Sequence, residues 1–145
     1  MAGAGAESTL ECQKMCETMA LAGADCFLIV TPSFYKMSER ALIRHFEEVA
    51  DFSPKPIIIS NLPSNTSVDM SAESIAELAQ HPNICGIKES SGDIAKIGQI
   101  LHLTRDLKIG HFQVLAGSAS ILFSAVALGA SGGICSLANV SFFKI

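Results

Sequence analysis

Lys88 is the residue of this sequence whose position suggests chemistry most strongly. It closes the apolar run Ile84–Lys88 and is followed closely by the small polar residues Ser90–Gly92. Because side chains alternate across a strand, Ile84, Gly86 and Lys88 are expected to share one face. Apolar surroundings lower the pKa of a lysine, and the neutral amine can then form a Schiff base with a ketone. The alternative is a lysine at a strand end that reaches solvent, since lysine is rarely fully buried.

Two other segments place polar groups where strand-like runs end. Pro56–Leu62 leads into Ser60–Thr66, whose two amides and several hydroxyls could bind a carboxylate, although these residue types also form plain turns. Ala116–Ser118 turns from a strand into a helix, where backbone N–H groups could hold an anion or simply form a capped loop. The glycine-rich segment 129–133 precedes a strand, which excludes a Rossmann or P-loop fingerprint.

The cysteines and histidines form no pattern typical of a metal site. The five cysteines include no CxxC pair, and three of them lie in apolar runs, which is typical of free thiols in a reducing compartment. His45 falls on a predicted helix among charged residues and is expected to be solvated. The other three histidines show no positioned partner in the sequence and are interpreted as surface residues.

The elements that must position these residues alternate between strand and helix. Strand-like runs are almost continuously apolar, as in parallel strands buried on both faces. They are Ala2–Ala6, Cys26–Thr31, Pro56–Leu62, Ile84–Lys88, Phe112–Ala116 and Gly133–Ala138. The runs between them have helical periodicity, with Ser38, Ser71, Asp93 and Ser118 as expected starts.

Length and composition leave two α/β architectures open. A doubly wound sheet suits 145 residues, and a complete flavodoxin-like binding domain would be one such case. A (β/α)8 barrel typically needs about 250 residues, so only part of one would fit. With 49% hydrophobic and 17% charged residues, the chain is not of the disordered class. The absence of a basic cluster argues against nucleic acid as partner, and no apolar run approaches the roughly 20 residues that cross a bilayer.

Six short segments resemble, in order, motifs of the dihydrodipicolinate synthase and N-acetylneuraminate lyase family. They are Ala2–Gly5, Val30–Tyr35, Ser60–Thr66, Gly86–Ser90, Leu115–Ser118 and Leu137–Val140. Members of that family are (β/α)8-barrel aldolases that form a Schiff base with pyruvate-like substrates. The resemblance implies a partial (β/α)8 barrel of the α/β class. Residues 1–145 would be a single incomplete domain, from about the third family strand to just after the eighth. The first two strands and the C-terminal helices would be missing.

The resemblance also implies roles for individual residues. Lys88 falls on the Schiff-base lysine, and Ser90 and Gly117 fall on positions that contact substrate. Asn65 and Thr66 lie in a loop expected to bind substrate. Ser60 stands where the family has a proton-relay tyrosine, and its hydroxyl is a shorter and much weaker acid than a phenol.

Within the family, the segments look most similar to 4-hydroxy-2-oxoglutarate aldolases, because Asn65 replaces a usual synthase arginine and Ser118-Ala119 replaces an acidic pair. This similarity implies cleavage of 4-hydroxy-2-oxoglutarate to pyruvate and glyoxylate without metal or organic cofactor. It also implies a homo-oligomer and a mitochondrial location, with the cytoplasm as alternative. The alternative functions are a dihydrodipicolinate synthase- or N-acetylneuraminate lyase-like enzyme, and a non-catalytic truncated homologue that binds or regulates. The chain alone is expected to self-associate.

Overall fold

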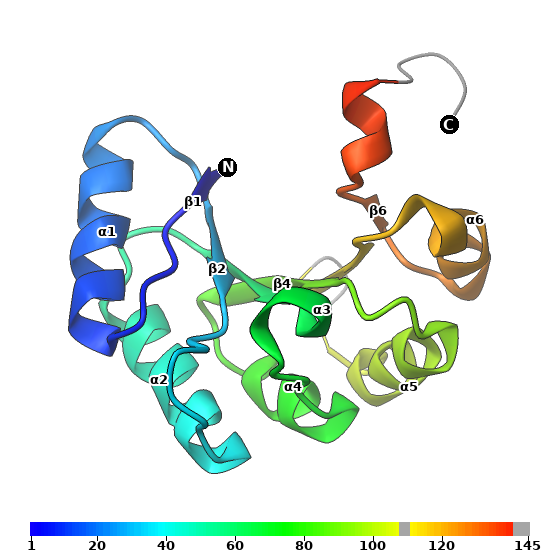
Figure 1. Ribbon diagram of the computed structural model, residues 1–145, viewed down its shortest axis with the longest axis horizontal. Coiled ribbons are helices and arrows are strands. Elements are labelled where there is room, and N and C mark those ends of the chain that lie inside the picture. The colour runs from blue at the N-terminus through cyan, green and yellow to red at the C-terminus, as the bar shows by residue number, and fades with distance from the viewer. Residues whose placement is uncertain (108–110, 141–145) are drawn as a thin grey trace.

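The described residues form one parallel sheet whose strand order follows the sequence. The computed structural model describes residues 1–107 and 111–140 (Figure 1). Within them the strands are β1 (Ala2–Gly3), β2 (Phe27–Val30), β3 (Ile57–Asn61), β4 (Ile84–Glu89), β5 (Gln113–Ala116) and β6 (Gly132–Gly133). The sheet order is β1-β2-β3-β4-β5-β6, with every pair parallel. A doubly wound sheet reverses its order at a switch point, so this architecture is excluded.

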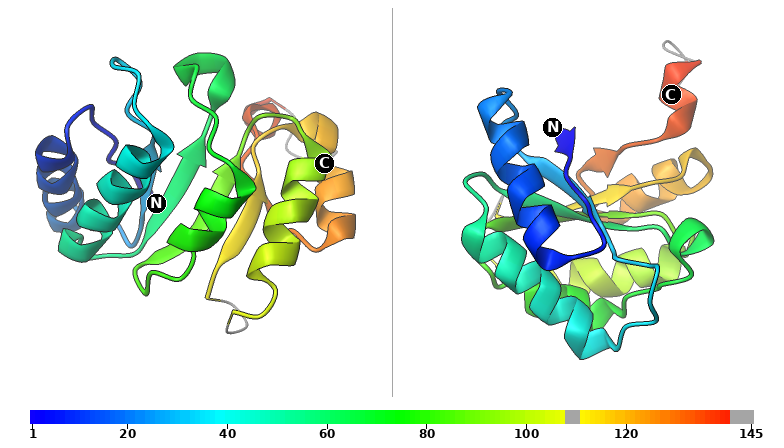
Figure 2. Two further views of the ribbon diagram at one scale, coloured as in Figure 1. Left: turned by 90° about the horizontal axis from the view of Figure 1, so that it is seen from below. Right: turned by 60° about the vertical axis from the view of Figure 1, so that its left-hand side comes forward.

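The longer helices cover the convex face of the curled sheet and leave its concave face open (Figures 1 and 2). The helices are α1 (Thr9–Leu21), α2 (Glu39–Phe52), the short α3 (Pro63–Thr66), α4 (Ala72–Leu78), α5 (Ile94–Thr104) and α6 (Ala119–Leu128), followed by the 3-10 turn η1 (Ser136–Asn139). Parallel strands in sequential order with helices outside are the arrangement of a (β/α)8 barrel. The predicted partial barrel is confirmed. Within the described residues, no helix has the length and apolar character needed to cross a membrane.

Three of the four expected helix starts are capped by the predicted side chain. Ser38, Ser71 and Asp93 each accept a hydrogen bond from a backbone N–H in the first turn of α2, α4 and α5. Such caps satisfy donors that have no partner within the helix. Ser118 precedes α6, but its side chain makes no capping bond, and its hydroxyl lies 2.8 Å from that of Ser120 instead.

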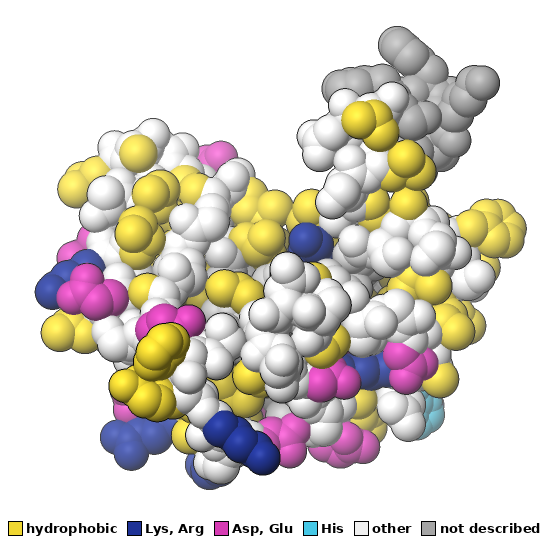
Figure 3. Space-filling model, in the orientation of Figure 1, with side chains coloured by type: hydrophobic (Ala, Val, Ile, Leu, Met, Phe, Trp, Pro, Cys, Tyr) yellow, Lys and Arg dark blue, Asp and Glu magenta, His cyan; other side chains and the backbone are white. Residues whose placement is uncertain are grey.

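The apolar core lies between the convex face and the helices. Ile59 and Ile87 of the central strands, Phe46 of α2 and Ile75 of α4 belong to this cluster and have no exposed surface. The opposite, concave face is not covered in the same way. Strand alternation places Leu28 and Val30 of β2 and Leu115 of β5 on this face, and all three are only partly buried. Figure 3 shows hydrophobic side chains along the hollow between the N-terminal elements and the segment after β6.

Both outermost strands are shorter than the sequence predicts. The strand predicted over Gly133–Ala138 is only Gly132–Gly133, and the chain continues into η1; the strand predicted over Ala2–Ala6 is only Ala2–Gly3. Among the described residues, each has a hydrogen-bonded neighbour on one side alone, through two residue pairs. Apolar composition therefore overestimates the length of an edge strand.

His45 is buried, so the expectation of a solvated histidine is wrong. It is 3% exposed between α1 and α2, with Nδ1 3.0 Å from the Thr9 hydroxyl and its ring edge-on to Phe46. Nε2 has no hydrogen-bond partner among the described residues. His45 lies three residues after Leu42 and four before Val49, on the same helical face, which outweighs its charged neighbours in the sequence.

Stability is expected to fall as the pH drops below about 6.5, the ordinary pKa of histidine. Desolvation lowers the pKa of His45, partly offset by the negative charges of Glu48 and Glu7. The unfolded chain then binds more protons than the folded one, so the contribution of neutral His45 is complete above the unfolded pKa and declines below it. Urea unfolding between pH 8 and 5 measures this slope. In His45→Gln the slope should be reduced; equal slopes in wild type and His45→Gln would contradict the expectation.

Candidate active site

Lys88 and Ser60 lie side by side at the carboxyl ends of two central strands. In the sheet register Lys88 is the partner of Ser60 on β3 and of Leu115 on β5. Partners on neighbouring strands point to the same face, and the flanking residues Ile87 and Glu89 are fully buried on the convex side. Lys88 is partly exposed on the open face, whereas Ser60 is 5% exposed. In barrels of this kind, active sites are built at this end of the strands.

A bulge in β4 sets the alignment of these two residues. Ile57 pairs with Ile84, but Ile58 pairs with Gly86, so one extra residue of β4 is inserted between them. Ile84 therefore faces the buried core, and the predicted common face holds for Gly86 and Lys88 but not for Ile84. A Cβ at Gly86 would lie 2.5 Å from the Gln113 carbonyl oxygen, so only glycine allows β5 to approach here.

Ser90 and Gly117 approach each other closely in the loops that follow β4 and β5. The Ser90 N–H donates to the Asn61 carbonyl at 2.9 Å, and the Gly117 N–H donates to the Glu89 carbonyl at 2.7 Å. These bonds extend the β3–β4–β5 ladder into the loops. The Ser90 hydroxyl oxygen is buried and has no hydrogen-bond partner among the described residues. A buried hydroxyl without a partner is costly, so this group is available to a ligand.

Replacing Gly117 by alanine is expected to displace Ser90. The new Cβ would lie 1.9 Å from the Ser90 oxygen and 3.0 Å from its Cα, so the loop must move. Overpacking of this kind costs about 1–3 kcal/mol of stability. Thermal melting checks this, with Gly98→Ala as control, because the nearest atom to a Cβ there is 3.8 Å away. Unchanged melting of Gly117→Ala would show that the Ser90 loop gives way without cost.

Asn65 and Thr66 lie on α3, above the strand ends. The Thr66 hydroxyl donates to the Leu62 carbonyl at 3.0 Å and accepts from the Val68 N–H at 3.2 Å, so it stabilises its own turn. Asn65 is exposed and accepts a hydrogen bond from the Ser64 hydroxyl at 2.9 Å. The expected pair of amides on one substrate loop is wrong for Asn61, whose side chain is fully buried on the convex side.

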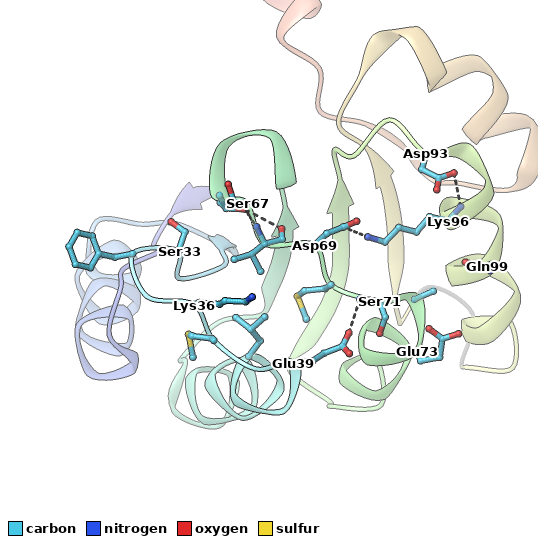
Figure 4. A pocket seen from close by; sticks show the side chains of 17 residues that line it. Ser33, Lys36, Glu39, Ser67, Asp69, Ser71, Glu73, Asp93, Lys96 and Gln99 are labelled. Atoms are coloured by element: carbon cyan, nitrogen blue, oxygen red, sulfur yellow. Dashed lines mark hydrogen bonds and ion pairs between the residues drawn. The ribbon is translucent and has the colours of Figure 1, made fainter.

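A groove on the rim of the sheet does not include the place where these residues meet. A groove of about 860 Å³ runs along the rim between the β2–α2 loop, the α3–α4 loop and the start of α5 (Figure 4). It includes Thr66, Asp69 and Lys96 but none of Lys88, Ser60, Ser90 and Gly117. The candidate site therefore lies on the open concave face, and the rim groove is a separate feature.

Sequence reasoning missed two buried charged residues, Glu89 and Lys96. Glu89 has no exposed surface and Lys96 is 8% exposed, with 3.4 Å between their charged groups. The available signal was alternation: if Lys88 faces inward, the next residue must face the core. Among the described residues, no group of three or more His, Cys, Asp or Glu is arranged to hold a metal ion.

A curled sheet of parallel strands in sequential order, with helices on its outer face, defines part of a (β/α)8 barrel. A profile of the dihydrodipicolinate synthetase family matches residues 1–142, and the chain belongs to this family. It is 39% identical over 140 residues to 4-hydroxy-tetrahydrodipicolinate synthase of Methanoculleus marisnigri, and equally so to that of Geobacter sulfurreducens. Each comparison covers 97% of this chain but 47% of the relative, so the chain spans about half the length of these curated relatives.

Solved structures of relatives share the fold. Dihydrodipicolinate synthase of Acinetobacter baumannii in complex with pyruvate has a TM-score of 0.90 at 32% identity, covering 96% of this chain and 46% of that one. YagE of E. coli K12, also in complex with pyruvate, has a TM-score of 0.85 at 33% identity, covering 92% of this chain and 45% of that one.

The expected mitochondrial location is wrong on this comparison. The two curated relatives named above come from an archaeon, Methanoculleus marisnigri, and a bacterium, Geobacter sulfurreducens, and such organisms have no mitochondria. The expectation of a mitochondrial location rests on the resemblance of a few short segments alone.

Proposed function

We propose that this chain carries the Schiff-base centre of a pyruvate-type lyase, with Lys88 as nucleophile. The observation that carries the proposal is the position of Lys88. It lies at the carboxyl end of β4, in register with Ser60, next to the unpartnered Ser90 hydroxyl and the close approach at Gly117. Membership of the dihydrodipicolinate synthetase family supports the same chemistry. The small-molecule partner proposed is a 2-oxo acid.

The proposed step is attack of the neutral Lys88 amine on the ketone carbon of the 2-oxo acid. The carbinolamine loses water to give an iminium ion, which accepts the electron pair of the carbon–carbon bond that breaks, or stabilises the carbanion that forms one. The lysine adduct is the electron sink, so the proposal needs no metal or organic cofactor. Ser90 and Gly117 hold the substrate. Ser60 is a weak substitute for a phenolic proton relay, and general acid–base help is worth about 10²–10⁴-fold.

Two reactions are compatible with a Schiff base at Lys88. The curated relatives are named 4-hydroxy-tetrahydrodipicolinate synthase, which favours the synthase reaction. Asn65, in place of a usual synthase arginine, and Ser118-Ala119, in place of an acidic pair, favour cleavage of 4-hydroxy-2-oxoglutarate to pyruvate and glyoxylate as the second candidate. Pyruvate release from 4-hydroxy-2-oxoglutarate separates the two.

Borohydride reduction in the presence of pyruvate is expected to trap one adduct, on Lys88. Reduction converts the iminium to a stable secondary amine, and peptide mass mapping locates it. Trapping is expected to be slow, because Ser60 cannot replace a phenol. The unreacted lysines, such as Lys14 and Lys36 on exposed surface, are the internal control.

Three outcomes of this experiment are informative. An adduct confined to Lys88 supports the proposal. Equal labelling of exposed lysines contradicts it, because it shows random amine chemistry. No adduct at any pyruvate concentration favours the non-catalytic alternative, in which the chain only binds or regulates.

A further inference from the structure

Directly behind the candidate site, the convex face of the sheet carries a polar cluster that is buried except for Asp69, whose side chain is 55% exposed. We define the strand-end cluster as Asn61, Asp69, Glu89 and Lys96 (Figure 4 labels Asp69 and Lys96). Asn61 and Glu89 are fully buried and pair with each other across β3 and β4. They follow Ser60 and Lys88 by one residue each. The cluster therefore shares two peptide units with the residues proposed to do chemistry.

Every polar group at the centre of the cluster has a partner. Glu89 Oε2 accepts from Asn61 Nδ2 at 2.9 Å and lies 3.4 Å from Lys96 Nζ. Asn61 Nδ2 also donates to Asp69 Oδ1 at 2.8 Å, and Lys96 Nζ donates to the same carboxylate. Burial works against ionisation of Asp69, but the hydrogen bonds from Lys96 and Asn61 outweigh it and lower the pKa of this carboxyl.

The cluster also bonds to the backbone of two loops. Glu89 Oε1 accepts from the Ser91 N–H at 2.7 Å, which fixes the loop that carries Ser90. Asn61 Oδ1 accepts from the Met70 N–H at 3.1 Å, which fixes the segment after α3. Lys96 lies in the first turn of α5 and so connects this helix to the cluster. Four side chains thus join the ends of two strands, the Ser90 loop, the α3–α4 segment and one helix.

Stability alone does not call for such a cluster. Replacing a buried ion pair with apolar residues of similar volume is often neutral or stabilising. Apolar side chains would close this part of the core, as the isoleucines do elsewhere on β3 and β4. What they would not supply are directional bonds to Ser91 and Met70. Because side chains alternate, holding Glu89 toward the core also holds Lys88 toward the open face.

We propose that the strand-end cluster is a positioning device for the candidate nucleophile, with Glu89 as its central positioning residue. Glu89 acts through Lys88 and the Ser90 loop and does not touch substrate. This inference rests on the proposed Schiff-base role of Lys88. A displacement of about 1 Å at a reacting group can cost roughly 10²-fold in rate, which is the size of effect expected here.

The test combines trapping kinetics with hydrogen exchange. The variants are Glu89→Gln and the double variant Glu89→Gln/Lys96→Met, which leaves no buried charge facing an absent partner. Glu77→Gln is the matched control, because it removes a 2.7 Å ion pair with Arg40 on the surface. Borohydride trapping is measured against pyruvate concentration. Exchange is followed by mass spectrometry over residues 61–70 and 86–92, with peptides of α1 as internal reference.

Both cluster variants are expected to lower the maximal trapping rate per folded molecule by about 10²-fold. The half-saturating pyruvate concentration should change much less. Exchange should rise in the two segments and not in α1. Glu77→Gln should behave as wild type. A purely structural role would reduce the folded fraction without changing the rate per folded molecule, and that result in both cluster variants would overturn the proposal.

The two proposals fail in different ways. If the wild-type chain traps pyruvate on Lys88 and the cluster variants trap it equally fast, the Schiff-base role stands and the positioning role is wrong. If the wild-type chain traps nothing, the proposed function fails. Local loosening of residues 61–70 and 86–92 would then still support a cluster that holds the strand ends, and unchanged exchange would overturn it.

Discussion

Replacing Lys88 by arginine is expected to abolish covalent capture of pyruvate. Arginine keeps the positive charge and most of the side-chain length, but its guanidinium is effectively always protonated and cannot act as an amine nucleophile. The site on the concave face would otherwise be unchanged, because Lys88 makes its backbone ladder bonds with β3 and β5 through groups that the substitution leaves intact. Borohydride trapping followed by peptide mapping measures the loss.

Lys36→Arg is the control for this substitution. Lys36 is exposed on the rim groove and has no place in the proposed chemistry, so its variant should trap pyruvate at the wild-type rate. A circular dichroism spectrum and melting curve equal to wild type would show that Lys88→Arg is folded. Undiminished trapping by folded Lys88→Arg would remove Lys88 from the reaction and end the proposal.

The residues that sequence reasoning placed correctly are those governed by local rules. Apolar runs and helix caps located the strands and the starts of α2, α4 and α5, because burial on both faces and unsatisfied N–H groups act within a few residues. The position of Lys88 followed from strand alternation near the strand end. Periodicity could not distinguish a barrel from a doubly wound sheet. The segments that resemble the family favoured the barrel.

Errors occur where tertiary contacts override the local pattern. One extra residue of β4 opposite Ile57 turned Ile84 away from the face of Lys88, and no sequence signal marks this bulge. Asn61 looks like a turn residue of the substrate loop, yet its amide is the link between Glu89 and Asp69. From the sequence, His45 is expected at the surface because charged residues, Arg44, Glu47 and Glu48, lie close to it. In each case the deciding partner lies 8 or more residues away in the sequence.

The open concave face is expected to lower the stability of the isolated 145-residue chain and to promote its self-association. Leu28, Val30 and Leu115 are partly exposed there, and Leu137 of η1 is 45% exposed at the margin. Burial of apolar surface contributes about 25 cal/mol per Å², so leaving a few hundred Å² exposed lowers the free energy of unfolding by several kcal/mol. A domain is typically stable by only about 5–15 kcal/mol, so this difference decides whether the monomer persists.

The same chain offers two sheet edges for association. β1 and β6 each pair with one neighbour, through two residues, which leaves unpaired backbone groups beside an apolar face. The chain is therefore expected to self-associate in sedimentation velocity runs, to melt over a broad range and to bind a hydrophobic dye.

Replacing Leu28 and Leu115 by threonine keeps strand-forming residues and makes the open face more polar, so association should weaken. The comparison pair Leu103→Thr and Phe123→Thr removes exposed apolar side chains of α5 and α6, away from the open face, and should weaken association less; an equal or larger effect would place the contact on the helices instead. A sharply melting wild-type monomer that binds no dye would contradict the prediction and show that the half-open sheet is stable as it stands.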